Sequence, residues 1–136
     1  MSSFDCLTNL RGDRLRGVRE LVYVAADGSS VPTREGVALD FDSHSVTITT
    51  TVESSEIRLE KGGFRGESPD HTIHDATNDH VLFPCIGERL LDWWSATNSQ
   101  GYTDGLMVAF GPALGVMFVA INNEVSILAV SGGQLA

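Results

Sequence analysis

The stretch EGVALDF, residues 35–41, decides the fold because a second stretch, DGLMVAF at residues 104–110, repeats its pattern. In both stretches every second side chain from the third position onward is large and apolar. Successive side chains of a β-strand point to opposite faces, so this spacing predicts a strand with one apolar face. A repeated strand pattern predicts a fold built from two similar units.

The repeat extends to both sides of these stretches. GVRELVYVAADGS (17–29) aligns with GERLLDWWSATNS (87–99) at an offset of 70. The same offset pairs three further apolar positions: Val46 with Val116, Ile48 with Phe118, and Ile57 with Ile127. Turn-forming residues separate the aligned segments. We therefore expect four strands in each unit, near residues 18–26, 36–42, 45–52 and 56–60, and near residues 88–96, 105–110, 115–121 and 124–130.

The predicted fold class is mainly β, with α+β as the alternative. The length of 136 residues is typical of one domain. We expect residues 1–136 to form a single domain in which units 17–61 and 87–131 are joined by a polar loop, residues 62–83. Each unit is a four-stranded antiparallel sheet with one apolar face, and two such sheets pack most simply as a sandwich or a strongly curved sheet. A short N-terminal helix is compatible with this plan.

Residues 84–97 allow a second interpretation. Pro84 suits the first turn of a helix, and Leu90, Leu91 and Trp94 have helical spacing. The repeat argues instead for a strand. On a strand the adjacent Trp93 and Trp94 point to opposite faces, so Trp93 is expected in the core, while Trp94 either anchors an interface or packs under a loop.

The two units differ in what their second face carries. In the first unit this face is mostly polar and suited to water: Ala38, Asp40, Thr47, Thr49, Arg58 and Glu60. In the second unit it is apolar: Met107, Ala109, Met117, Val119, Ile121, Leu128 and Val130. Such a patch is unusual on a monomer, so we expect a cover. The candidates are the N-terminal segment 1–16, a second copy of the chain in a homodimer, and a different protein.

Composition narrows the function classes. The formal charge of −9 opposes binding to nucleic acid, whose phosphates proteins neutralise with Lys and Arg. No stretch is long and apolar enough for a membrane span, and the N-terminus lacks the order of a signal peptide. Cys6 and Cys85 are too few for a disulfide framework, so we expect both to be reduced and the protein to be cytoplasmic.

The polar loop contains the one candidate metal site. His71, His74 and His80 alternate with acidic residues, and imidazole with carboxylate is a ligand set for zinc or another transition metal. Glycines and a proline in the same loop are typical of a solvated connection instead. We expect no bound cofactor.

Motifs for catalysis are missing from the sequence. There is no GxSxG elbow, and the Gly-rich piece GGFRG lacks the lysine of a phosphate-binding loop. Asp40 and Asp42 could act as acid and base, but alternation places both on the solvated face, where burial would not separate their pKa values. We therefore expect a protein that is not an enzyme.

The segment from GERLLDWW through NSQGYTDGLMVAF to VAINNEVSILAV resembles small bacterial β-rich proteins of the toxin-immunity type. The resemblance implies a protein-binding module that occludes a basic toxin, for which an acidic surface is suited. We assign partner binding to Trp94 as the apolar anchor and to Asp92, Asp104 and Glu124 as steering charges. Two alternatives stay open: a metal-binding protein or metal-dependent enzyme that uses residues 70–80, and a homo-oligomeric accessory domain.

Overall fold

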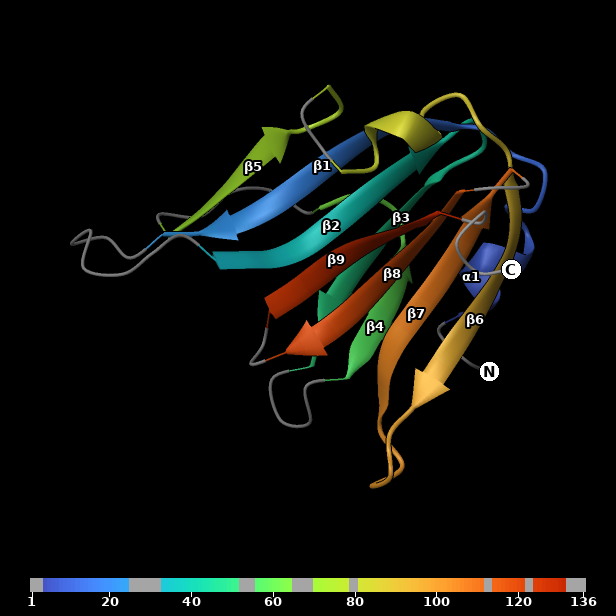
Figure 1. The fold of residues 1–136 in the computed structure, drawn as a ribbon. Coiled ribbons are helices and arrows are strands. Elements are labelled where there is room, and N and C mark those ends of the chain that lie inside the picture. Colours follow the sequence, from blue (N-terminus) through green and yellow to red (C-terminus); the bar gives the residue numbers. More distant parts are fainter. Residues whose placement is uncertain are drawn as a thin grey trace.

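A computed structural model describes residues 4–24, 33–51, 56–64, 70–78, 81–111, 114–121 and 124–131. The strands form two antiparallel sheets that pack face to face (Figure 1). The mainly β class is thereby confirmed. Within the described residues, no helix has the length and apolar character that crossing a membrane requires.

The first sheet has five strands in the order β4–β3–β2–β1–β5, and the second has four in the order β6–β7–β8–β9. Each unit is a meander in which neighbouring strands pair in sequence. The bounds are β1 Leu15–Tyr23, β2 Thr33–Phe41, β3 Ser45–Thr50, β4 Ile57–Lys61, β5 His71–Asp75, β6 Leu90–Thr97, β7 Thr103–Phe110, β8 Leu114–Ile121 and β9 Glu124–Ser131.

Two local predictions need correction. The segment predicted as a loop, 62–83, contains β5, which pairs with the free edge of β1. Its polar side chains concealed the strand, although Thr72 and Ile73 are β-branched and favour one. The helix alternative for residues 84–97 is wrong, because Pro84 lies in the short 3₁₀ turn η1 (Phe83–Cys85) and β6 follows it.

The register also corrects the alignment of the two units. Phe41 and Phe110 are equivalent, and so are Val46 and Val116, as the repeat predicts. In the first strand, however, Leu15 lies opposite Phe41 and Leu90 opposite Phe110, which sets the offset there at 75. The true counterparts are GDRL (12–15) and GERL (87–90). In the last strand Leu59, rather than Ile57, is the counterpart of Ile127.

The two matching segments bind each other in an antiparallel bridge between Arg14 and Arg89. The Gly12 amide donates to the Leu90 carbonyl at 2.8 Å, and the equivalent Gly87 amide donates to the Leu15 carbonyl at 2.7 Å. The side chains are reciprocal too. Arg14 Nη1 donates to the Gly87 carbonyl at 2.7 Å, and Arg89 Nη1 donates to the Gly12 carbonyl at 3.0 Å. Such exchange is what a local two-fold axis produces, and we call residues 12–15 with 87–90 the junction.

Helix α1 (Asp5–Thr8) precedes the junction and belongs to the core. Leu7 and Leu10 are fully buried, and Phe4 stacks on Trp93 with ring centroids 5.8 Å apart. Trp93 packs against the core cluster, to which Phe4, Leu7 and Leu10 belong, so the described part of the N-terminal segment contributes to the core. It is therefore not the cover for the apolar outer face of the second sheet.

The outer face of the first sheet is less exposed than its sequence predicts. Ala38 is fully buried and Thr47 is 7% exposed, although both were expected to meet water. Residues 62–64, which we call the strap, leave the end of β4 and lie against this face. Thr47 Oγ1 donates to the Gly62 carbonyl at 2.6 Å, which fixes the strap on β3.

The junction predicts a matched pair of stability effects. Gly12 and Gly87 have φ values of +89° and +86°, a backbone conformation that residues with a Cβ rarely adopt. We expect Gly12→Ala and Gly87→Ala each to lower the free energy of unfolding by about 1–3 kcal/mol, as measured by urea denaturation. Nothing lies within 4 Å of either Cβ position, so steric crowding does not add to this strain.

Asparagine tolerates positive φ better than alanine, so Gly12→Asn and Gly87→Asn serve as controls and should cost less than the alanine variants. Equal losses for alanine and asparagine, or no loss at either position, would contradict the assigned backbone strain.

Candidate functional site

A row of apolar side chains crosses the whole outer face of the second sheet. In the register of the four strands, Trp94 lies opposite Met107, Met107 opposite Met117, and Met117 opposite Leu128. Residues directly opposite each other share a face and are in contact distance. These four residues form one continuous band, which we call the apolar stripe.

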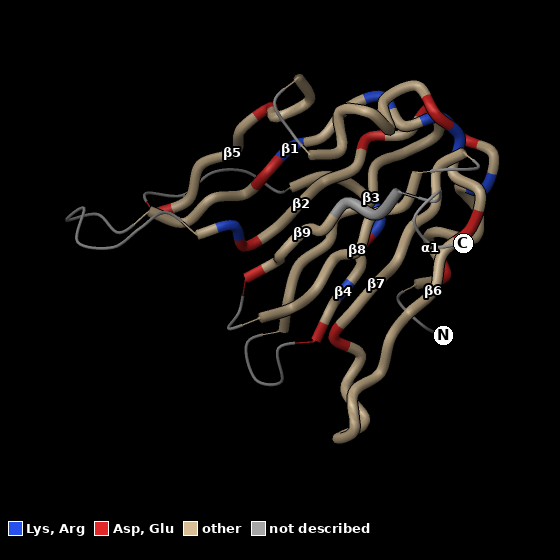
Figure 2. The backbone as a smooth tube through the Cα atoms, viewed as in Figure 1, with Lys and Arg blue, Asp and Glu red and all other residues tan. Residues whose placement is uncertain are grey.

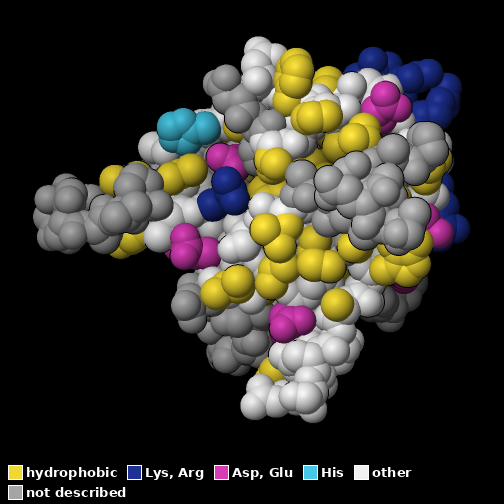
Figure 3. Space-filling view, in the orientation of Figure 1, with side chains coloured by type: hydrophobic (Ala, Val, Ile, Leu, Met, Phe, Trp, Pro, Cys, Tyr) yellow, Lys and Arg dark blue, Asp and Glu magenta, His cyan; other side chains and the backbone are white. Residues whose placement is uncertain are grey.

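The apolar stripe is open to solvent at both ends. Trp94 is 54% exposed and Leu128 is 56% exposed, while the two methionines between them are partly buried. Ile121, on the same face, is 50% exposed. Figure 3 shows apolar side chains gathered over the strands of this sheet. The placement of Trp94 and Trp93 on opposite faces agrees with the strand interpretation of the sequence.

Two of the predicted steering acids, Asp92 and Glu124, lie on this same face, and Asp92 already has hydrogen-bond partners within the chain. Asp92 Oδ1 accepts Arg11 Nη2 at 2.8 Å and also the backbone amide of Trp93 at 2.9 Å. The second contact caps an edge amide of β6, a position where an unpaired donor would invite another strand. Glu124 lies opposite Ile121 at the start of β9. Asp92 therefore protects the sheet edge, whereas Glu124 borders the face.

Asp104 does not join this group. Gly105 alternates onto the outer face with Ala96 and Val119, so Asp104 falls on the core-facing side at the open end of β7. Its carboxylate accepts Asn98 Nδ2 at 3.4 Å. The sequence carried the signal, because the alternation that places Leu106 and Val108 on the inner face also places Asp104 there; the assignment of Asp104 to partner binding did not apply it.

The histidines do not converge. His71 and His74 are three positions apart on β5, so they point to opposite faces. His71 Nε2 is 2.8 Å from Glu35 Oε1, and His74 Nε2 is 2.9 Å from Thr72 Oγ1. His80 lies outside the described residues. Within the described ranges, no group of three His, Cys, Asp or Glu residues could hold a metal ion.

The two candidate acids, Asp40 and Asp42, each pair with a different arginine. Asp40 accepts two bonds from Arg19, at 2.9 and 2.7 Å. Asp42 accepts Arg16 Nε at 2.6 Å, and this hydrogen bond lowers the pKa of the Asp42 carboxyl. Figure 2 shows acidic and basic residues interspersed along the first sheet rather than one shared acidic centre. Each carboxylate acts as the partner of a cation.

The thiols are poor nucleophiles. Cys85 is a free thiol that is buried, with 3% of its surface exposed. Burial raises the pKa of the Cys85 thiol from 9.0 to about 11, with a further contribution from the charge of Glu88. Burial likewise raises the pKa of Cys6. A thiol needs a lowered pKa to react at neutral pH, so neither fits a catalytic role.

These pKa values predict slow alkylation. At pH 8 the thiolate fraction of Cys85 should be about a hundredfold smaller than that of a thiol with the ordinary pKa of 9.0. In the Cys6→Ser variant, iodoacetamide should therefore modify Cys85 at least about a hundredfold more slowly than in the same variant unfolded in urea. The rate should climb as the pH approaches 11. Equal rates in folded and unfolded protein would contradict the burial of this thiol.

Comparison with known proteins places nearly the whole chain in one family. Residues 1–133 match the model of a family described as a family of unknown function, DUF6334. A search of curated proteins and a search of solved structures each found no match. Because the match extends over far more than half of the sequence, the chain belongs to DUF6334.

Proposed function

We propose that this protein is a non-enzymatic protein-binding module, and that the apolar stripe is its contact surface for a basic protein partner. The observation that carries the proposal is the exposure of Trp94 and Leu128 in one unbroken cross-strand row. A partner that binds this row would remove its apolar side chains from water.

The residue types of the apolar stripe favour binding of a protein. Tryptophan and methionine are enriched at the buried centres of interfaces, and a single tryptophan often dominates the binding free energy. The partly buried Met107 and Met117 adapt their shape easily, since methionine is unbranched and flexible. Trp94 is half exposed before binding, so contact with a partner would remove much of its ring from water.

Charge supports a basic partner. The chain carries a formal charge of −9, and opposite charges speed association while they add salt dependence. Glu124 borders the apolar stripe and is our first steering residue; Asp92 is already paired with Arg11. Neutralisation of a basic bacterial toxin, as the sequence resemblance implies, is a narrower form of this proposal.

A site-specific crosslinking experiment tests the proposal. A photo-crosslinking residue at Leu128 should capture a basic protein from a lysate of the source organism, and the same residue at Arg58 on the first sheet should not. Capture should fall at high salt. With the captured partner purified, Trp94→Ala should weaken binding by about 2 kcal/mol or more, which is roughly thirtyfold.

Phe83→Ala provides the matched control. Phe83 is an aromatic residue with 51% exposure, but it lies in η1 rather than on the second sheet, so its truncation should leave the affinity unchanged. Crosslinks between two copies of this chain, together with a dimeric mass by light scattering, would instead assign the apolar stripe to self-association. Equal effects of Trp94→Ala and Phe83→Ala would contradict the apolar stripe as the binding surface.

A further inference from the structure

We propose that the outer face of the first sheet carries a separate small-molecule site, a shallow pocket of about 300 Å³ that binds a neutral polyhydroxy compound such as a monosaccharide. The pocket lies beside the strap and is lined by Thr47, Thr49, Arg58, Glu60, Gly63 and Phe64. Its volume falls at the lower end of the range for small-molecule sites. This site is independent of the apolar stripe, which lies on the other sheet.

One wall of the pocket is the strap, and its position is fixed at several points. The Gly62 amide donates to the Ser45 carbonyl at 2.7 Å, and the Gly62 carbonyl accepts Thr47 Oγ1 at 2.6 Å. A Cβ on Gly63 would stand 2.7 Å from Arg19 Nη2, so a side chain at this position would displace the Arg19 guanidinium. Asp40 holds the Arg19 guanidinium in place through two hydrogen bonds.

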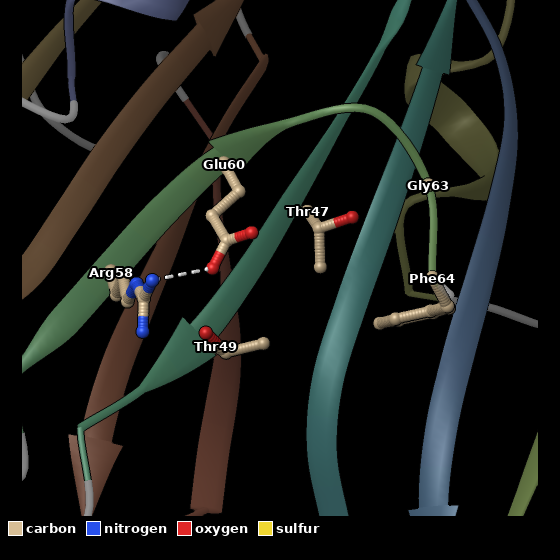
Figure 4. Close-up of a pocket in the computed structure, with 6 residues that line it drawn as sticks. All are labelled: Thr47, Thr49, Arg58, Glu60, Gly63 and Phe64. Carbon is tan, nitrogen blue, oxygen red and sulfur yellow. Dashed lines mark ion pairs between the residues drawn. The ribbon is translucent and has the colours of Figure 1, made fainter. Parts of the chain in front are cut away.

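The aromatic ring of the strap is positioned by a second glycine. A Cβ on Gly36 would stand 2.9 Å from Phe64 Cε1, so the ring packs directly against the β2 backbone. Figure 4 shows Phe64 and Gly63 on one side of the pocket and Arg58 with Glu60 on the other, with Thr47 and Thr49 of β3 between them. The pocket therefore has a preformed apolar wall facing a polar one.

The polar wall contains one positive and one negative side chain, Arg58 and Glu60, whose charges cancel. Arg58 Nη2 lies 2.9 Å from Glu60 Oε1, and the two side chains alternate onto the same outer face of β4. A guanidinium has five N–H donors and a carboxylate has two acceptor oxygens, so one contact leaves most of this capacity unused. Thr49 adds a hydroxyl that both donates and accepts.

This combination selects the ligand class. The attraction of Arg58 for an anion such as phosphate is offset by repulsion from Glu60, and the reverse holds for a cation, so the pair favours neither charge. A zwitterion would have to break the Arg58–Glu60 pair to match its charges. A polyol can bind while the Arg58–Glu60 pair stays intact, because its neighbouring hydroxyls accept hydrogen bonds from Arg58 and donate hydrogen bonds to Glu60. The apolar C–H face of a sugar ring can pack against Phe64.

Titration of the ¹⁵N-labelled protein with D-glucose, D-galactose, D-mannose and N-acetyl-D-glucosamine, followed by NMR, tests the proposal. At least one sugar should shift the amides of Thr49, Arg58, Glu60 and Gly63, with a dissociation constant of about a millimolar. Amides of β6–β9 should not move. Thr49→Val removes the hydroxyl at constant shape and should weaken binding several-fold; Arg58→Ala should weaken it at least tenfold.

Arg16→Ala is the matched control, since Arg16 forms an exposed ion pair with Asp42 away from the pocket. The Arg16→Ala and Trp94→Ala variants should both bind sugar with the affinity of the unmodified protein. Three results would overturn the proposal. They are no shifts with any of the four sugars, sugar shifts that survive both pocket substitutions, and a stronger response of the same amides to phosphate or glycine than to sugar.

Discussion

The reciprocal hydrogen bonds of the junction set the geometry on which the rest of the molecule depends. They join residues 12–15 to residues 87–90 at the beginnings of β1 and β6, so both sheets start from this one bridge. Leu15 and Leu90 then lie opposite Phe41 and Phe110, whose rings stack with centroids 6.2 Å apart. Because side chains alternate along every strand, this one arrangement determines which face of each sheet is buried.

The junction leaves the two outer faces with different surroundings. The first sheet is extended by β5 and covered in part by the strap, which buries Ala38 and Thr47 and creates a small polar pocket. The second sheet presents the apolar stripe, with half-exposed side chains at its ends. The two units share one strand order but present different side chains to solvent, namely the lining of the pocket on the first sheet and the apolar stripe on the second.

Alternation and the repeat together predicted eight strands. They also predicted the inner faces of β2, β3, β7 and β8, since Val37, Val46, Leu106 and Val116 repeat with the period of a strand. The offset of the first strand was wrong, because the glycine and arginine of GVRE were matched to GERL. GDRL shares Gly, Arg and Leu with GERL, and the hydrogen bonds show that it is the counterpart. The sequence analysis did not predict the strap or β5, because glycine-rich and polar segments are typical of loops. For the site, alternation separated Trp94 from Trp93, but the row through all four strands required the pairing register.

The most direct test of the central claim is hydroxyl-radical footprinting of the free protein, read residue by residue by mass spectrometry over a range of protein concentrations. The claim is that Trp94 and Leu128, the two ends of the apolar stripe, are exposed to solvent in the folded protein. We expect Trp94 and Leu128 to be labelled rapidly at every concentration, whereas Phe118, which is fully buried on the opposite face of β8, stays protected. Protection of Trp94 and Leu128 to the level of Phe118 in dilute solution would contradict this account.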